Sequence, residues 1–305
     1  MNQFKGVVPA LVTPMRADGS LHEESLRRIL EFNIAAGVHG FWVAGGTGES
    51  VLLEDGENRR IAEIAAEVCR GRAFHIHHVG AATTSRAAAL AEHAAGAGAD
   101  AVCCVPPFFY PRREEEIVEH YRAVAAAADL PFFCYNLPGC TNVEITAGLM
   151  KKLQDAVPQL AGVKHSAQNF HNIRAFSSMG LATFTGSCHW MLPAMTTGGA
   201  GCVDGPPNLV PECWVAIWNA FEAGDIEAAR RAQSRASNVV ESLISLFEGG
   251  RYVAICKHVL GRRLGIECGD PRLPALPLSG EQRAAVDRAL EQLALEPVPE
   301  EAGVR

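Results

Sequence analysis

The chain has 305 residues, of which 48% are hydrophobic and 20% are charged, and its formal net charge is −7. This composition is typical of a globular enzyme, and the length permits one large domain or two ordinary ones with a sizeable core. The negative charge argues against a general nucleic-acid surface, no apolar stretch is long enough to span a bilayer, and the first residues carry no signal core, so we expect a cytoplasmic protein.

Short apolar runs alternate with amphipathic stretches along most of the chain, and eight such pairs can be counted. The predicted strands are residues 7–13, 40–44, 74–79, 101–105, 132–136, 160–164, 183–186 and 201–204. The predicted helices lie near residues 22–37, 57–70, 84–97, 114–128, 146–155, 170–179, 188–198 and 210–223.

This alternation predicts an α/β fold. Continuous apolar strands are typical of a parallel sheet buried on both faces, and strands that alternate with helices form βαβ units. Eight units indicate a (β/α)8 TIM barrel, which we place at residues 1–224. A doubly wound sheet is the alternative, but the run 13–16 (TPMR) after the first strand is not a phosphate-binding loop.

No strand-like run follows residue 224. Three further helices are predicted near residues 225–247, 251–264 and 280–294, and the first carries a narrow apolar stripe at helical spacing. Residues 225–305 are therefore expected to form an appended C-terminal helical segment. Prolines at 271, 274 and 277 make a stiff connector before its last helix.

The cysteines and histidines do not predict a metal site. None of the ten cysteines is spaced as CxxC, and the paired spacings of a zinc site are absent. His75, His77 and His78 are close in sequence, but alternation along a strand directs His77 and His78 to opposite faces. We predict no metal and expect free thiols, as in a reducing compartment.

Lys164 stands in the apolar run 160–166 (LAGVKHS) and is one of five lysines. The other four lie in termini or in helix-like, charge-bearing stretches. An ammonium at the end of a buried strand is poorly solvated, so burial favours the neutral amine, which is a nucleophile toward carbonyl groups. The alternative is that the strand ends there and the ammonium reaches water.

Two other strand ends carry groups of chemical interest, because reactive groups of a barrel lie at the carboxyl ends of its strands. The run 45–50 (GGTGES) follows the second strand, and its glycines let N–H groups converge on a carboxylate or a phosphate. Tyr135 begins the run 135–138 (YNLP), and a phenol can pass a proton. A plain turn and a core tyrosine are the alternatives.

The motifs GGTGES at 45–50, YNLP at 135–138 and GVK at 162–164 resemble, in order and spacing, those of the dihydrodipicolinate synthase and N-acetylneuraminate lyase superfamily. The resemblance extends from about residue 4 to residue 295. It implies a (β/α)8 barrel with a C-terminal helical segment, a homotetramer built as a dimer of dimers, and class I aldolase chemistry on a 2-oxo acid without a cofactor. Lys164 then matches the Schiff-base lysine and Tyr135 the proton-shuttling tyrosine, while Gly46 and Thr47 match the loop that holds the carboxylate.

The chain departs from the synthases at three positions. Gly46 stands where the synthases carry a hydroxyl residue. The synthases also contribute a tyrosine across a subunit interface, and the nearest position in this sequence is Phe109, with Tyr110 beside it. Cys140 replaces the arginine that binds the carboxylate of the aldehyde substrate. Loss of such a cation costs a few kcal/mol, which argues against the synthase reaction.

The chain also departs from the sialic acid lyases. After Gly186 it carries Cys188 and His189 instead of the acidic residues that bind sugar hydroxyls. In addition to the carboxylate loop, we predict substrate contacts at Ser166, Gly186, Val203, Asp204 and His189. His165, Asp204 and His189 are candidates for a general acid, although His165 can instead face a helix and Asp204 can cap one.

The predicted function is that of a lyase that forms a lysine Schiff base with pyruvate or another 2-oxo acid and then catalyses aldol cleavage, condensation or dehydration. Sugar-derived 2-oxo-3-deoxy acids and hydroxylated amino-acid catabolites are the expected substrates. The alternatives are 4-hydroxy-tetrahydrodipicolinate synthase, which condenses pyruvate with aspartate semialdehyde, and a non-catalytic paralogue that binds a 2-oxo acid. The expected partner is a small molecule, not a nucleic acid or a membrane.

Overall fold

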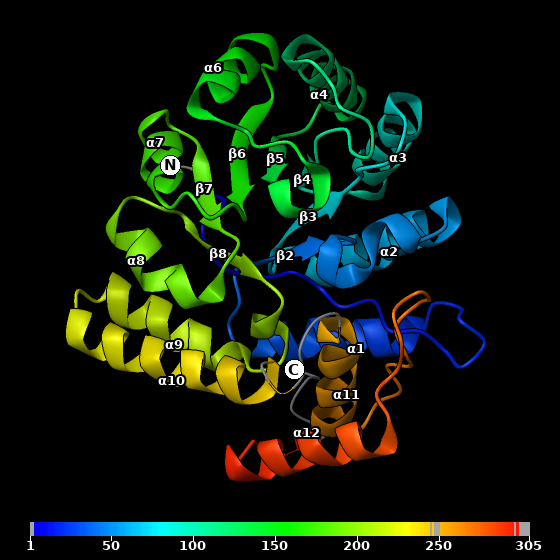
Figure 1. Ribbon diagram of the computed structural model, residues 1–305, viewed down its shortest axis with the longest axis vertical. Helices are drawn as coiled ribbons and strands as arrows, with labels where there is room; N and C mark the ends of the chain where they lie inside the picture. Colours follow the sequence, from blue (N-terminus) through cyan, green and yellow to red (C-terminus); the bar gives the residue numbers. More distant parts are fainter. Residues whose placement is uncertain (1–2, 245, 247–250, 296, 299–305) are drawn as a thin grey trace.

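Eight parallel strands surround the centre of the molecule in the computed structural model, which describes residues 3–244, 246, 251–295, 297 and 298 (Figure 1). The strands are β1 (Gly6–Pro9), β2 (Gly40–Val43), β3 (Phe74–His78), β4 (Ala101–Cys104), β5 (Phe132–Asn136), β6 (Leu160–His165), β7 (Ala182–Thr185) and β8 (Gly201–Asp204). Their hydrogen-bonded order is β1-β8-β7-β6-β5-β4-β3-β2. A parallel bridge between Ala10 and Trp42 joins the two ends of this order, so the sheet curls into a barrel.

Helices lie outside the ring of strands (Figure 1). They are α1 (Glu23–Ala35), α2 (Asp55–Cys69), α3 (Thr84–Ala97), α4 (Glu114–Ala128), α5 (Pro138–Thr141), α6 (Ala147–Ala156), α7 (His171–Ser178), α8 (Met191–Thr196), α9 (Pro211–Glu222), α10 (Ile226–Ile244), α11 (Tyr252–Leu264) and α12 (Gly280–Gln292). Helix α12 lies farther out, against α10 and α11 (Figure 1). Four 3₁₀ turns stand after strand ends: η1 (Gly46–Gly48), η2 (Ser50–Leu52), η3 (Cys188–Trp190) and η4 (Pro206–Asn208).

Alternation along the strands separates two apolar layers. One layer fills the barrel interior and includes Val8, Trp42, Ile76, Phe133 and Phe184. The residues between them point outward and pack against the helices, as Val163 and Cys134 do. The strands are thus apolar on both faces, as the sequence predicted for a parallel barrel.

The eight strands and the barrel are confirmed, with local differences. The first strand ends at Pro9 and not at residue 13, because Ala10 forms only an isolated bridge and the Thr13 hydroxyl already donates to Gly48 O, at 2.8 Å, in the loop after β2. The helix predicted at 188–198 is divided into η3 and α8, which places Pro193 in the first turn of α8, where proline is tolerated. The short helix α5 lies outside the predicted helices.

The C-terminal helices share a core with the barrel. Side chains of α9, α10, α11 and α12 belong to the same apolar cluster as those of β1, α1 and α2, and α11 lies beside α1 (Figure 1). Because this core is continuous, a boundary at residue 224 stays a prediction. The helix predicted at 225–247 is α10, and the end of the predicted range, at residues 245 and 247, lies outside the described residues. None of the helices in the described ranges is long and apolar enough to cross a bilayer.

Candidate active site

Lys164 and Tyr135 are neighbours at the carboxyl ends of β6 and β5, where they form a register pair. Both are buried, with 3% and 5% of their surface exposed. The Lys164 Nζ atom lies 4.3 Å from the centroid of the Tyr135 ring and 5.5 Å from that of the Trp42 ring. The amine therefore faces the barrel interior between two aromatic rings, and not bulk solvent.

The loop after β2 reaches the same point. A Cβ atom placed on Gly46 would lie 3.7 Å from the Tyr135 hydroxyl oxygen. The turn η1 closes with a bond from Gly48 N to Gly45 O, which leaves the N–H groups of Gly46 and Thr47 outside the turn's own hydrogen bonds. Free N–H groups with a nearby hydroxyl are suited to hold an anion.

Glu49 stands near the end of this loop and connects it to the C-terminal segment. It has a left-handed backbone, with φ 65°, and is buried. One oxygen of its carboxylate forms an ion pair with Lys257 of α11 at 2.6 Å, and the other accepts from the backbone N–H of Arg272 at 2.6 Å. The sequence placed Lys257 in a charge-bearing stretch, but the structure buries it, with 1% of the residue exposed.

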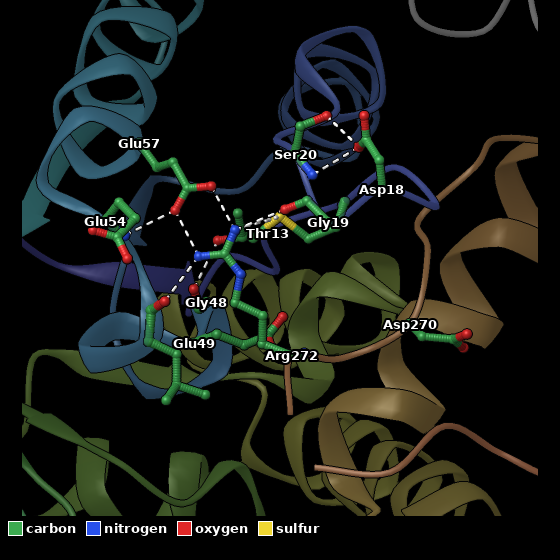
Figure 2. A network of polar contacts seen from close by, with 12 residues as sticks. Thr13, Asp18, Gly19, Ser20, Gly48, Glu49, Glu54, Glu57, Asp270 and Arg272 are labelled. Atoms are coloured by element: carbon green, nitrogen blue, oxygen red, sulfur yellow. Dashed lines mark hydrogen bonds and ion pairs between the residues drawn. The ribbon is translucent and has the colours of Figure 1, made fainter. Parts of the chain in front are cut away.

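Arg272 attaches the C-terminal segment to three parts of the barrel mouth. Its guanidinium pairs with both oxygens of Glu57 on α2 and donates to Leu52 O at 2.8 Å and Gly19 O at 2.7 Å (Figure 2). This pairing lowers the pKa of Glu57 and raises that of Arg272. The loop after β2 is thus held by contacts with residues outside the barrel.

A cavity of about 290 Å³ opens beside Tyr135 and Gly46. Its lining is mostly apolar and contains no basic side chain among the residues that form it: Gly46, Glu49, Ser50, Val51, Leu52, Val105, Phe108, Tyr135, Leu137, Cys140, Thr141, Val253, Pro271 and Ala275. Glu49 is already paired with Lys257. The lining includes Phe108, whereas Phe109 and Tyr110 are 79% and 62% exposed.

Three residues predicted to contact substrate lie at the ends of β6, β7 and β8: Ser166, Gly186 and Val203. The Ser166 hydroxyl lies 1.8 Å from the point where a Cβ on Gly186 would stand, so the glycine makes room for the serine. Val203 is fully buried in the barrel interior with Trp42 and Tyr135. Contact of these three residues with substrate stays a prediction.

Asp204 and His189, the polar residues predicted to contact substrate, have protein partners in this structure. The oxygens of Asp204 accept from the backbone N–H groups of Cys188 and Gly205, each at 2.8 Å. His189 Nδ1 lies 3.3 Å from the Ser237 hydroxyl of α10. Both side chains therefore fasten loops, and their contact with substrate stays a prediction.

His165 points away from the amine, toward helix α7. Its Nδ1 lies 3.1 Å from Asn136 Nδ2, its Nε2 lies 2.9 Å from Asn169 O, and its ring packs on Phe176. Burial lowers the pKa of His165. Since both ring nitrogens are engaged, this arrangement favours the structural alternative over a general acid.

His78 is a site neighbour that we did not propose from the sequence. Its ring lies 6.1 Å from the Tyr135 ring, and burial together with the charge of Lys164 lowers its pKa to about 4, so the imidazole is neutral near pH 7. Alternation in β3 could have placed it inside the barrel with Ile76. His75 and His77 lie on the other face, where His75 Nε2 is 3.1 Å from His77 Nδ1 and His77 Nε2 is 3.0 Å from Asn58 Oδ1.

Tyr252 was also missed. Its hydroxyl is buried near Thr47 and Gly205. It comes from α11, and nothing in its local sequence indicates that this helix reaches the barrel mouth. Within the described part of the chain, no three His, Cys, Asp or Glu side chains come together as a metal-ligand set.

Known proteins resemble this chain over nearly its whole length. The family model described as the dihydrodipicolinate synthetase family matches residues 3–293. An uncharacterized DapA-like lyase of Halobacterium salinarum is 37% identical over 292 residues, which cover 95% of this chain and 94% of the relative. A 4-hydroxy-tetrahydrodipicolinate synthase of Phenylobacterium zucineum is 32% identical over 295 residues, 96% of this chain and 98% of the relative.

Solved structures are similar to the same extent. The wild-type sialic acid aldolase of Ruminococcus gnavus matches with a TM-score of 0.90 and 26% identity, covering 96% of this chain and 97% of the aldolase. Dihydrodipicolinate synthase of Aquifex aeolicus matches with a TM-score of 0.87 and 26% identity, covering 97% of this chain and all of that one. The two enzymes are named for different reactions, so similarity alone does not select one of them.

Proposed function

The chain belongs to the dihydrodipicolinate synthetase family, whose members are class I aldolase-type lyases, and from this premise we propose that it forms a Schiff base between Lys164 and a 2-oxo acid. The observation that supports this most is the buried contact between Lys164 Nζ and the Tyr135 ring, 4.3 Å from its centroid, at adjacent strand ends. An amine kept from solvent beside a phenol is equipped for imine chemistry.

The proposed reaction begins when the amine of Lys164 attacks the ketone carbon of a 4-hydroxy-2-oxo acid. The carbonyl oxygen leaves as water, and Tyr135 supplies and recovers the protons of this step. Loss of the 4-hydroxyl proton then breaks the bond between C3 and C4, an aldehyde departs, and the electron pair forms an enamine. Protonation of the enamine at C3 and hydrolysis release pyruvate and return the free amine.

The carboxylate of the 2-oxo acid is proposed to bind the N–H groups of Gly46 and Thr47 and the Thr47 hydroxyl. This anchor fixes the ketone carbon relative to the amine. Orientation of this kind can contribute up to about 7–11 kcal/mol to a reaction barrier. The position of this loop is fixed by Glu49, which contacts Lys257 and the backbone of Arg272 in the C-terminal segment.

Exchange of the pyruvate methyl protons for deuterium tests the proposal, because reversible enamine formation releases these protons. We expect the protein to accelerate loss of the methyl NMR signal in D2O, and Tyr135→Phe to slow this exchange by roughly a hundredfold or more. Tyr121→Phe is the control, since the Tyr121 hydroxyl bonds to Cys104 O outside the barrel interior. Exchange no faster than in buffer would support the non-catalytic paralogue instead.

The cavity beside Tyr135 supports an apolar distal half of the substrate. Val51, Leu52, Val105, Phe108 and Leu137 line it, and none of the residues that form it is basic. A carboxylate such as that of aspartate semialdehyde would lose its hydration there without gaining a cation. A polyhydroxylated sugar chain would meet few hydrogen-bonding side chains.

Condensation of pyruvate should therefore proceed faster with an apolar aldehyde such as benzaldehyde than with aspartate semialdehyde. We expect kcat/KM to differ by at least about tenfold, equivalent to 1.4 kcal/mol. The measurement is the initial rate of pyruvate consumption with each aldehyde. Cys140→Arg, which restores a cation to the cavity wall, should improve the rate with aspartate semialdehyde, whereas a wild-type preference for aspartate semialdehyde or a polyhydroxylated aldehyde would refute the apolar assignment.

We also propose a cytoplasmic homotetramer, a dimer of dimers, as the family resemblance implies. The exposed side chains of Phe109, Tyr110, Leu273 and Leu276 support an interface, since large apolar groups in solvent often mark contacts between subunits.

A further inference from the structure

The Tyr252 hydroxyl is buried and has no hydrogen-bond partner in the part of the chain that the structure describes. Buried hydroxyls are nearly always hydrogen-bonded in folded proteins. An unpaired one beside a binding site points to a bond that is completed when a neighbouring side chain turns toward a ligand. Tyr252 opens helix α11, so the group comes from outside the eight strands.

Glycine at position 205 makes room for this phenol. A Cβ on Gly205 would lie 1.7 Å from the Tyr252 oxygen and 3.0 Å from the Thr47 hydroxyl oxygen. The phenol oxygen thus stands where a side chain at the end of β8 would otherwise stand, next to Thr47. Backbone strain does not require the glycine, since its φ is −74°.

The phenol of Tyr252 stays in its neutral form and so keeps a proton to donate. Burial, with smaller contributions from Cys256 and Asp204, raises the pKa of Tyr252 well above its usual value. The Thr47 hydroxyl lies close enough to the phenol to oppose this rise. The oxygen of Thr47 lies on the same side of Gly205 as the phenol and can accept its proton.

We propose that Tyr252 is a positioning residue for 2-oxo acid binding: its hydroxyl donates to Thr47 Oγ1, which turns the Thr47 hydroxyl to donate to the carboxylate. The proposal rests on the proposed function of the loop that holds Thr47. It adds a residue of the C-terminal segment to the site. It also accounts for the glycine at position 205, because a side chain there would clash with the phenol. The ligand group concerned is the carboxylate, whatever the distal half of the substrate.

Tyr252→Phe tests this role because it removes one oxygen and keeps the ring. The yield of borohydride-trapped Lys164 adduct is measured against pyruvate concentration. Loss of one hydrogen bond should raise the half-saturating concentration about three- to tenfold, while the yield at saturation stays within about twofold of wild type. Tyr121→Phe, at a buried tyrosine with a protein partner, should leave the half-saturating concentration unchanged.

A second pair of variants separates positioning from packing. Tyr252→Leu should weaken pyruvate binding, and Gly205→Ser in the Tyr252→Leu background should recover it, because the new hydroxyl stands near the lost one. An unchanged half-saturating concentration in Tyr252→Phe, an equal change in Tyr121→Phe, or no recovery with serine would each overturn the proposal. Absence of any adduct in the wild type would refute the Schiff-base function itself, which is a different outcome.

Discussion

Replacement of Lys164 by methionine is expected to abolish covalent capture of pyruvate and to lower the rate of methyl-proton exchange by at least about a thousandfold. The change removes the amine but keeps an unbranched side chain between Tyr135 and Trp42. Removal of a covalent nucleophile leaves only the contribution of substrate binding and orientation. The measurement is the mass of the protein after incubation with pyruvate and borohydride, with peptide mapping to locate the adduct.

The control for this variant is Lys152→Met, because Lys152 is an exposed lysine paired with Glu114. It should take up the adduct at Lys164 as the wild type does. Thermal unfolding of both variants shows whether the fold persists. An adduct of equal yield on the Lys164→Met protein, or a wild-type adduct on another lysine, would contradict the assignment of Lys164.

Replacement of Lys257 by methionine is expected to lower the free energy of unfolding by about 3–5 kcal/mol. The reason is the buried ion pair with Glu49, whose two side chains are only 1% and 3% exposed. Methionine has a similar length but leaves the carboxylate without its cation, although the N–H of Arg272 still donates to it. The loss should appear in urea unfolding as a lower midpoint with little change in slope.

Two comparisons separate the contribution of the buried ion pair to stability from the effect of removing any lysine. Lys152→Met breaks a surface ion pair and should cost at most about 1 kcal/mol. The double variant Glu49→Gln with Lys257→Met removes both charges and should recover part of the stability lost in the single one. Equal destabilisation of Lys257→Met and Lys152→Met would show that the buried pair contributes no more than a surface pair. Because Glu49 ends the loop that contains Gly46 and Thr47, Lys257→Met should also raise the half-saturating concentration of pyruvate.

The parts of the site that lie on strands could be predicted from the sequence. Lys164 and Tyr135 each end an apolar run, and carboxyl ends of parallel strands meet at one end of a barrel, so their proximity followed from topology. Their neighbour Gly46 followed from the glycines after β2. His78 obeys the same rule, and we missed it because it was considered only as part of a histidine cluster.

The parts that depend on helices outside the barrel could not be predicted. Tyr252 and Lys257 lie on α11, and their inward direction results from how that helix packs on α1 and the barrel mouth, which no local pattern encodes. Asp204 and His165 were placed at strand ends correctly. Their backbone and side-chain partners are set by neighbouring loops, so the sequence could not decide between substrate contact and a structural role.

The distribution of the ten cysteines has a practical consequence. Nine of them are buried, and burial raises the pKa of thiols such as Cys69, to about 12. Cys140 alone is exposed, and it stands on the wall of the cavity beside Tyr135. A maleimide dye would therefore attach at a single point in the native protein without removal of any other thiol, and its fluorescence would report directly on molecules that enter the cavity.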